Sequence, residues 1–149
     1  MIIRVLSFRE SEQILWRFTC EGDNINPSLS IDDAPLGTRS LVLIMDDPDA
    51  TRGETWDHWV VWNIPPETRE IPEGWSAPAD IKQGTTSFGD QKYGGPCPPP
   101  GAKPHRYVFK LYALDAVLDI PAGVEKKDVE KAMAGKVIAE ARTVGLFGR

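Results

Sequence analysis

Residues 93–115, YGGPCPPPGAKPHRYVFKLYALD, carry a Gly/Pro-rich loop that runs directly into a histidine and an apolar, aromatic-rich strand. The prolines fix φ, remove N–H donors and keep the residues before them out of the helical region, so this loop is stiff and extended. A stiff loop loses little entropy when it presents polar groups, as binding sites require. The loop and the strand over 106–114 therefore predict a preorganised site at one end of a sheet.

Two more segments have the length and composition of central strands. The run SLVLIM at 40–45 is continuously apolar and leads into the acidic turn DDPD at 46–49, and HWVVWNI at 58–64 is β-branched and aromatic. Together with 106–114, these strands are apolar on both faces, which indicates a sheet covered on each side. Weaker strands are expected near Ile2–Leu6, Ile14–Phe18 and Ile81–Gly84.

The hydrophobic period changes toward the end of the chain. Apolar residues over 126–133 follow helical spacing, and Gly135 is placed to close that helix. A second short helix is expected over 136–143. Strands followed by helices are typical of an antiparallel sheet with appended helices.

Length and composition favour a single domain over residues 1–149. A net charge of −5 and the lack of a basic run argue against nucleic acid as the main partner. The N-terminus does not resemble a secretory signal, and no apolar run approaches the roughly 18 residues of a membrane span. We therefore expect a cytoplasmic protein without an integral membrane segment, in which Cys20 and Cys97 are free thiols.

The two histidines of the chain, His58 and His105, each stand at the start of a strong strand, and Asp47 and Asp49 stand just beyond the end of another. If these strands are neighbours, all four side chains converge at one end of the sheet. Strand alternation places His58 on the face that carries the residues two and four positions later, Val60 and Trp62, and places His105 with Tyr107.

Hydrogen-bond donors in this cluster suit an oxyanion or a phosphoryl group. The donors are the two imidazoles, the hydroxyl of Tyr107 and the backbone N–H groups of Gly94 and Gly95. A bare carboxylate repels an anion, so Asp47 fits if it orients or charges a histidine. Asp49 fits if it accepts backbone N–H bonds in its own turn.

Other interpretations of these residues stay open. Each residue also has a purely structural interpretation, such as a simple Asx-turn for DDPD. Two aspartates and two histidines are competent metal ligands, but their spacing matches no known zinc pattern. Cys97 is favoured as a structural thiol because nothing in the sequence activates it. Motifs of covalent catalysis are absent from the sequence, whereas an Asp–His acid–base pair remains compatible with the residue types.

Four ordered blocks of the chain resemble one family. They are FTCEGDNINPSLS at 18–30, LVLIMDDPDA at 41–50, DHWVVWNIP at 57–65 and the loop–strand segment at 93–115. In this order and spacing they resemble the phosphatidylethanolamine-binding protein family, which includes the Raf-kinase-inhibitor proteins, in its small prokaryotic branch. The resemblance implies a mostly β fold, an antiparallel Greek-key β-sandwich with short peripheral and C-terminal helices, and a small pocket for phosphate-like head groups.

The resemblance also implies which residues form that pocket. Carried over position by position, the ligand-binding residues are Asp47, Asp49, Trp56, His58, Gly95, Pro96, Pro98, His105 and Tyr107. Aromatic rings such as Trp56 can receive the cationic head of a ligand. The chain departs from the family pattern at Thr51, where a proline is usual, and at Phe147, where a tyrosine is common.

Two classes of function follow. The first is a non-enzymatic binding protein for small phosphate-bearing or other anionic ligands, without a cofactor or a metal. The second is an inhibitor or regulator of a larger enzyme, a serine protease or a kinase, through the stiff proline-rich loop. A hydrolase acting through Asp and His is a weaker third option, and a homodimer is expected by analogy with small prokaryotic members.

Overall fold

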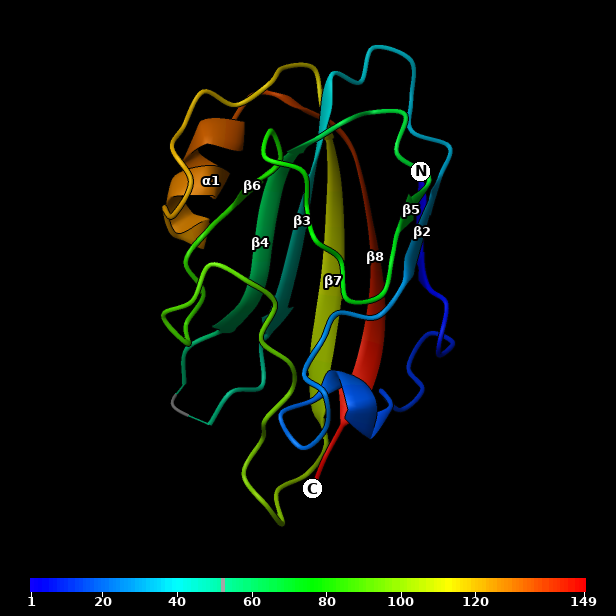
Figure 1. The fold of residues 1–149 in the computed structure, drawn as a ribbon, viewed down its shortest axis with the longest axis vertical. Helices are drawn as coiled ribbons and strands as arrows, with labels where there is room; N and C mark the ends of the chain where they lie inside the picture. The colour runs from blue at the N-terminus through cyan, green and yellow to red at the C-terminus, as the bar shows by residue number, and fades with distance from the viewer. Residues whose placement is uncertain (52) are drawn as a thin grey trace.

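The computed structural model describes residues 1–51 and 53–149, which form two antiparallel β-sheets that enclose one hydrophobic core, the smaller sheet lying on the β8 side of the larger one (Figure 1). The five-stranded sheet has the order β6-β4-β3-β7-β8, and the three-stranded sheet has the order β1-β2-β5. This architecture confirms the predicted mostly β, antiparallel sandwich. The elements are β1 (Ile2–Val5), the 3-10 helix η1 (Trp16–Phe18), β2 (Leu29–Asp32), β3 (Ser40–Asp47), β4 (Trp56–Ile64), β5 (Glu70–Ile71), β6 (Lys82–Gln83), β7 (His105–Leu114), α1 (Lys126–Met133) and β8 (Val137–Phe147).

The three strongest predicted strands are confirmed as β3, β4 and β7, which lie side by side in the larger sheet. Their side chains alternate between two cores. On β3, Leu43 and Met45 belong to the inner core between the two sheets, whereas Val42 and Ile44 belong to an outer core on the opposite face. Burial on both faces explains the apolar runs of β3 and β4. For β7 the prediction is only partly right, because its outer face carries exposed Arg106 and half-buried Lys110.

The outer core is covered by α1, which packs against β4 as Figure 1 shows. Val129 and Met133 are the buried residues of this helix, in agreement with the predicted helical spacing. The helix ends before Gly135, whose φ of 78° reverses the chain into β8.

The second predicted helix, over 136–143, is wrong because this segment is the first part of β8. The whole of β8 pairs with β7, with Val137 opposite Leu114 at one end and Phe147 opposite His105 at the other. A helix of eight residues is marginal in isolation, whereas the open edge of β7 offers a full ladder of backbone partners. Tertiary pairing therefore overrides the local pattern.

The weaker strand predictions have mixed outcomes. The segment Ile2–Leu6 contains β1, and Ile81–Gly84 contains the two-residue strand β6. The strand expected over Ile14–Phe18 is wrong, because the chain turns there into η1. The short strands β2 and β5 were not predicted.

Among residues 1–51 and 53–149, no helix combines the length and the apolar character that a membrane crossing needs. The single domain, the cytoplasmic location and the homodimer stay predictions.

Candidate functional site

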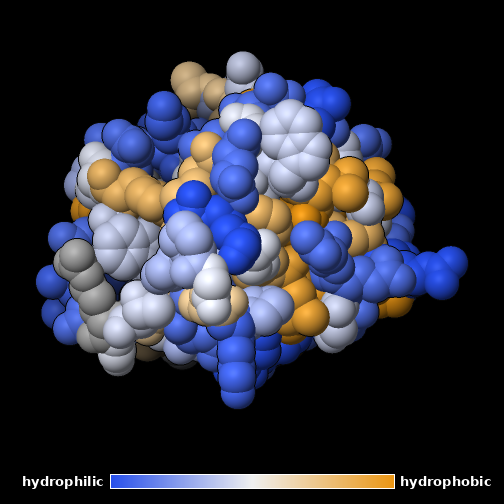
Figure 2. Space-filling view, turned by 90° about the horizontal axis from the view of Figure 1, so that it is seen from below, coloured by the Kyte–Doolittle hydropathy of each residue, from blue (hydrophilic) through white to orange (hydrophobic). Residues whose placement is uncertain are grey.

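A pocket of about 280 Å³ opens at the end of the larger sheet where β3 ends and β7 begins. Figure 2 views the molecule from this end, where apolar surface is exposed among polar side chains. Six of the nine predicted site residues line the pocket. The lining consists of Asp47, Ala50, Thr51, Trp56, His58, Phe88, Cys97, Pro98, Pro99, His105 and Tyr107.

Asp47 and His105 form a buried pair in the pocket wall. The ring nitrogen Nδ1 of His105 lies 2.7 Å from Oδ2 of Asp47, and both side chains are less than a tenth exposed. The other carboxylate oxygen of Asp47 accepts the backbone N–H of Asp49 at 2.8 Å. Asp47 therefore holds Nδ1 of His105 as a donor, as the sequence interpretation required, and leaves Nε2 as the ring nitrogen that is available to a ligand.

His58 reaches the pocket through an irregularity in β4. In the pairing of β3 with β4, Met45 lies opposite Trp59 and Asp46 lies opposite Asp57, so His58 is an extra residue. Such a bulge changes the face to which the side chain points. The imidazole packs against Tyr107 in the inner core, with ring centroids 5.2 Å apart, and the prediction that it shares a face with Val60 and Trp62 is wrong.

The second imidazole is also fixed in one tautomer. Nδ1 of His58 lies 2.6 Å from the carbonyl oxygen of Gly94, which can only accept, so Nδ1 is the donor. Burial lowers the pKa of His58, and the Gly94 carbonyl and the charge of Asp47 oppose that shift. A neutral His58 with its Nδ1 engaged presents Nε2 as an acceptor, and it becomes a donor once the ring is protonated.

Tyr107 supplies a hydroxyl with no hydrogen-bond partner among the residues that the structure describes. Its side chain is fully buried, lines the pocket and stacks on the His105 ring with centroids 6.4 Å apart. Burial raises the pKa of this phenol, and so do the charges of Asp47 and Asp49, which keeps the hydroxyl protonated. An unsatisfied buried hydroxyl costs about 1–3 kcal/mol, so this group is a donor in need of an acceptor.

Asp49 does not line the pocket. Its carboxylate accepts the backbone N–H, Nε and Nη2 of Arg106, each at 2.9 Å. The hydrogen bond from the Arg106 side chain lowers the pKa of Asp49 to about 2, although partial burial acts in the opposite direction. We predicted that Asp49 accepts a backbone N–H within its own turn, but Asp47 is the acceptor there and the N–H of Asp49 is the donor. Asp49 instead links the turn after β3 to the start of β7 through Arg106.

Gly95 and Pro96 also lie outside the lining, and the backbone donors expected from this loop are already engaged. The N–H of Gly94 donates to the carbonyl of His58 at 2.9 Å, and that of Gly95 donates to the side chain of Asn24 at 2.7 Å. A side chain at Gly95 would collide with the carbonyl oxygen of Phe18. These residues therefore fasten the loop rather than contact a ligand.

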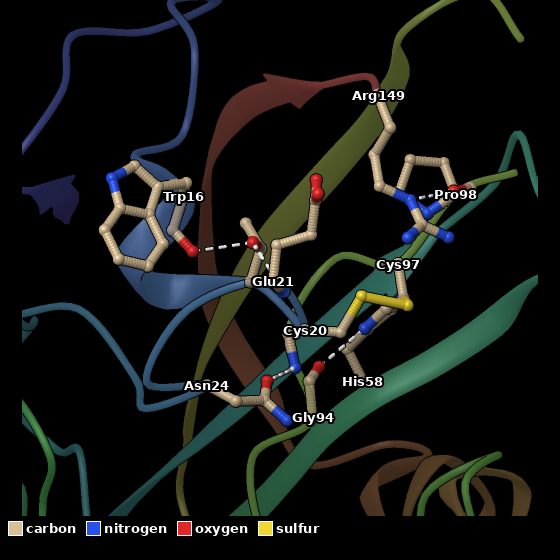
Figure 3. The surroundings of a disulfide bond; sticks show 11 residues. Trp16, Cys20, Glu21, Asn24, His58, Gly94, Cys97, Pro98 and Arg149 are labelled. Atoms are coloured by element: carbon tan, nitrogen blue, oxygen red, sulfur yellow. Dashed lines mark hydrogen bonds between the residues drawn. A yellow bond between two sulfur atoms is a disulfide. The ribbon is translucent and has the colours of Figure 1, made fainter. Parts of the chain in front are cut away.

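The cysteines form a disulfide, so the expectation of two free thiols is wrong. Cys20, which follows η1, is bonded to Cys97 in the pocket wall, with Cα atoms 5.4 Å apart (Figure 3). The two residues are 77 positions apart in the sequence, and only the folded topology places the proline-rich loop against the segment after η1.

Five lining residues were not among the predicted site residues. Four of them (Ala50, Thr51, Cys97 and Pro99) directly adjoin the predicted motifs. Phe88 is different, because it comes from the loop after β6 and packs edge-on against Trp56 and His58 at 5.5 and 5.3 Å. A lone aromatic in the polar loop over 87–92 was the only signal for it. Phe147, a departure from the family pattern, is a core residue and does not line the pocket.

The family model described as phosphatidylethanolamine-binding protein matches residues 5–148. A UPF0098 protein of Aquifex aeolicus is 48% identical over 96% of this chain and 85% of its own length. Another UPF0098 protein, from Methanothermobacter thermautotrophicus, is 44% identical over 100% of this chain and 99% of its own length.

Solved structures agree with this assignment. The crystal structure of a putative phosphatidylethanolamine-binding protein homologue, CT736 from Chlamydia trachomatis, superposes with a TM-score of 0.92 at 36% identity, covering 99% of this chain and 97% of that chain. YbcL of E. coli, a member of the mammalian PEBP family, gives 0.91 at 31% identity with the same coverage. The chain belongs to the phosphatidylethanolamine-binding protein family.

Proposed function

We propose that this protein binds small ligands carrying a phosphoryl or similar anionic group, without transforming them. The observation that carries the proposal is the buried hydroxyl of Tyr107, which has no partner among the described residues and lies beside both histidines. An anion with several acceptor oxygens would satisfy this hydroxyl and accept from Nε2 of each protonated ring.

The electrostatics of the pocket predict how the affinity for an anion changes with pH. The charge of Asp47 opposes an anion, but its carboxylate is engaged by His105 and by the backbone N–H of Asp49. An anion stabilises a protonated His58, whose pKa burial lowers in the empty pocket. Affinity is therefore expected to rise as the pH falls, until the ligand itself is protonated.

Binding without catalysis is supported by the way the reactive groups are engaged. Cys97 is held in a disulfide, and both oxygens of Asp47 accept hydrogen bonds. Neither group is therefore free to act as a nucleophile, which supports binding without covalent catalysis by Cys97 or Asp47. Turnover of a phosphoester that stops in His105→Ala would contradict this part of the proposal.

Inhibition of a protease is the second candidate. The fold resembles that of a carboxypeptidase Y inhibitor, solved in complex with its cognate proteinase, with a TM-score of 0.60 at 15% identity. The lip of the pocket from Pro99 to Gly101 is exposed and stiffened by proline, and such a loop loses little entropy on entering a cleft. Inhibition assays against serine proteases at micromolar protein concentration test this alternative.

Calorimetric titration of inorganic phosphate and phosphoethanolamine tests the main proposal. We expect the wild type to bind, Tyr107→Phe to bind about tenfold more weakly, and the double variant His58→Ala/His105→Ala to lose binding. Tyr112→Phe is the matched control, because Tyr112 lies on the same strand outside the pocket. Equal affinity in all four proteins would refute the assignment of the anion to this pocket.

A further inference from the structure

One wall of the pocket, Cys97 to Pro99, belongs to a segment that can donate few backbone hydrogen bonds. Residues 96–100 read PCPPP, so Cys97 alone has a backbone N–H. A segment of this kind cannot join a sheet as a regular strand. Its position therefore depends on its carbonyl groups and on side-chain links.

The links are unevenly distributed along the loop. Before Cys97, three hydrogen bonds fasten it to residues 18–24: the hydroxyl of Tyr93 donates to the carbonyl of Phe18, the N–H of Gly95 to the side chain of Asn24, and the N–H of Cys20 to the carbonyl of Pro96. From Cys97 to Pro99, the described residues provide the disulfide and two hydrogen bonds. Nε of Arg149 donates to the carbonyl of Pro98 at 2.6 Å (Figure 3), and the N–H of Ala102 donates to the carbonyl of Pro99 in a local turn at 3.3 Å. The disulfide is thus the covalent restraint on the part of the loop that lines the pocket, and it links this part to the segment after η1, whereas the hydrogen bonds link it to Arg149 and to its own turn.

This disulfide is accessible to other thiols. Cys97 is exposed and Cys20 is half-buried. They are the only cysteines in the chain, so thiol chemistry has a single target. An exposed disulfide can exchange with a thiolate, whereas one enclosed in a core cannot.

We propose that Cys20–Cys97 is a reversible thiol–disulfide exchange site that sets the affinity of the adjacent pocket. The proposal rests on the anion-binding function proposed above. The co-reactant is a dithiol reductant. Its first thiolate attacks one sulfur and forms a mixed disulfide, and the other cysteine leaves as a thiolate and takes up a proton.

The second thiol of the reductant then attacks the mixed disulfide and releases the remaining cysteine. Two electrons pass to the protein, which gains two thiols, and the reductant becomes a disulfide. Oxidation by a dithiol–disulfide partner reverses each step.

The oxidised form is the high-affinity form. Reduction leaves the wall from Cys97 to Pro99 attached through the carbonyls of Pro98 and Pro99, without a link to the segment after η1. The bonds of Tyr93, Gly95 and Cys20 still fasten the preceding residues. The pocket then exchanges between the closed wall and displaced ones. If the closed form falls to about one tenth of the population, the dissociation constant rises about tenfold.

Titration of inorganic phosphate into oxidised, dithiothreitol-reduced and reoxidised wild type measures this coupling. We expect about tenfold weaker binding after reduction, recovery after reoxidation, and no effect of dithiothreitol on the double variant Cys20→Ser/Cys97→Ser, which should bind like the reduced wild type. Equal affinity in the oxidised and reduced forms would overturn the redox proposal and leave anion binding intact.

A ligand-independent readout separates the two proposals. The ring resonances of His58 and His105 are followed by NMR during reduction, while circular dichroism monitors the fold. If no form binds phosphate, the anion-binding function fails. The redox coupling then stands if these resonances shift reversibly in a folded protein, and it falls if they do not move. Global unfolding on reduction at 25 °C would also overturn it, because the disulfide would then be a structural staple.

Discussion

Replacing both cysteines with serine should lower the thermal stability of the protein measurably without unfolding it at 25 °C. The disulfide joins residues 77 positions apart. Closing a loop of that length in the unfolded chain removes about 15 cal/mol/K of entropy, which corresponds to about 4.5 kcal/mol at 25 °C. Measured values more often fall between about 2 and 4 kcal/mol. A domain of this size is typically stable by about 5–15 kcal/mol, so the variant should remain folded.

The expected shift in melting temperature follows from the entropy of unfolding. At about 2.1 cal/mol/K per residue, 149 residues give about 310 cal/mol/K. A loss of 2 to 4.5 kcal/mol then lowers Tm by about 6–14 °C. Differential scanning calorimetry of oxidised wild type, reduced wild type and Cys20→Ser/Cys97→Ser measures the shift. The last two should agree, and a difference below about 3 °C from the oxidised protein would refute the reasoning from chain entropy.

Three further predictions concern groups in and beside the pocket. Tyr107→Phe should leave Tm unchanged or raise it, because it removes a buried hydroxyl that has no partner among the described residues. If urea unfolding shows that the free energy of unfolding falls by more than about 1 kcal/mol, this hydroxyl has a hydrogen-bond partner in the free protein and the prediction is wrong. Folding lowers the pKa of His58, so the neutral ring stabilises the folded state. This contribution to the free energy of unfolding is complete above the unfolded pKa of about 6.5, and it is lost as the pH falls through the folded pKa. His58→Gln, which can still donate to Gly94, should flatten unfolding free energy against pH below about 6.5, and an unchanged slope would contradict the shift. Lys126→Met should cost about 1.5–3 kcal/mol, because it removes charged hydrogen bonds of Lys126 Nζ to the buried carboxylate of Asp46 at 3.2 Å and to the partly exposed carboxylate of Asp57 at 2.7 Å. Asp46 keeps Lys110 at 2.9 Å, so its charge stays paired. Chemical denaturation tests this, with the exposed Lys127→Met as the control.

The central part of the fold was predictable because its physical cause is local. The strands β3 and β4 are buried on both faces over most of their length, so most of their residues must be apolar and the runs are visible without knowledge of their neighbours. In β7, one face is buried and supplies a regular apolar alternation, while the other carries exposed Arg106 and half-buried Lys110. The helix α1 was predictable for a similar reason, because one face packs on the outer core and leaves a regular spacing.

The elements that were missed depend on partners distant in the sequence. The first part of β8 has no strong periodicity of its own and becomes a strand because the edge of β7 is open to it. The disulfide has the same origin. The residues around Cys20 and Cys97 form no pattern that predicts their proximity in the folded chain.

In the site, residue types were easier to predict than roles. The pairing of Asp47 with His105 follows from strands that end and begin at one sheet edge. The neighbouring Asp49 was assigned to the pocket from its motif, yet Arg106 holds it outside, because the geometry of the turn decides which carboxylate points inward. Phe88 was missed because its loop has no regular pattern.

The bulge in β4 has a consequence for how this site can be acquired or lost during evolution. His58 faces the inner core because one extra residue interrupts the pairing between Asp57 and Trp59. Shortening the strand by one residue here would restore a regular ladder and would leave the pocket without its second imidazole. Relatives should therefore gain or lose this donor through single-residue insertions and deletions as well as through substitution. An alignment that scores only amino-acid identity at this position would overlook that kind of change.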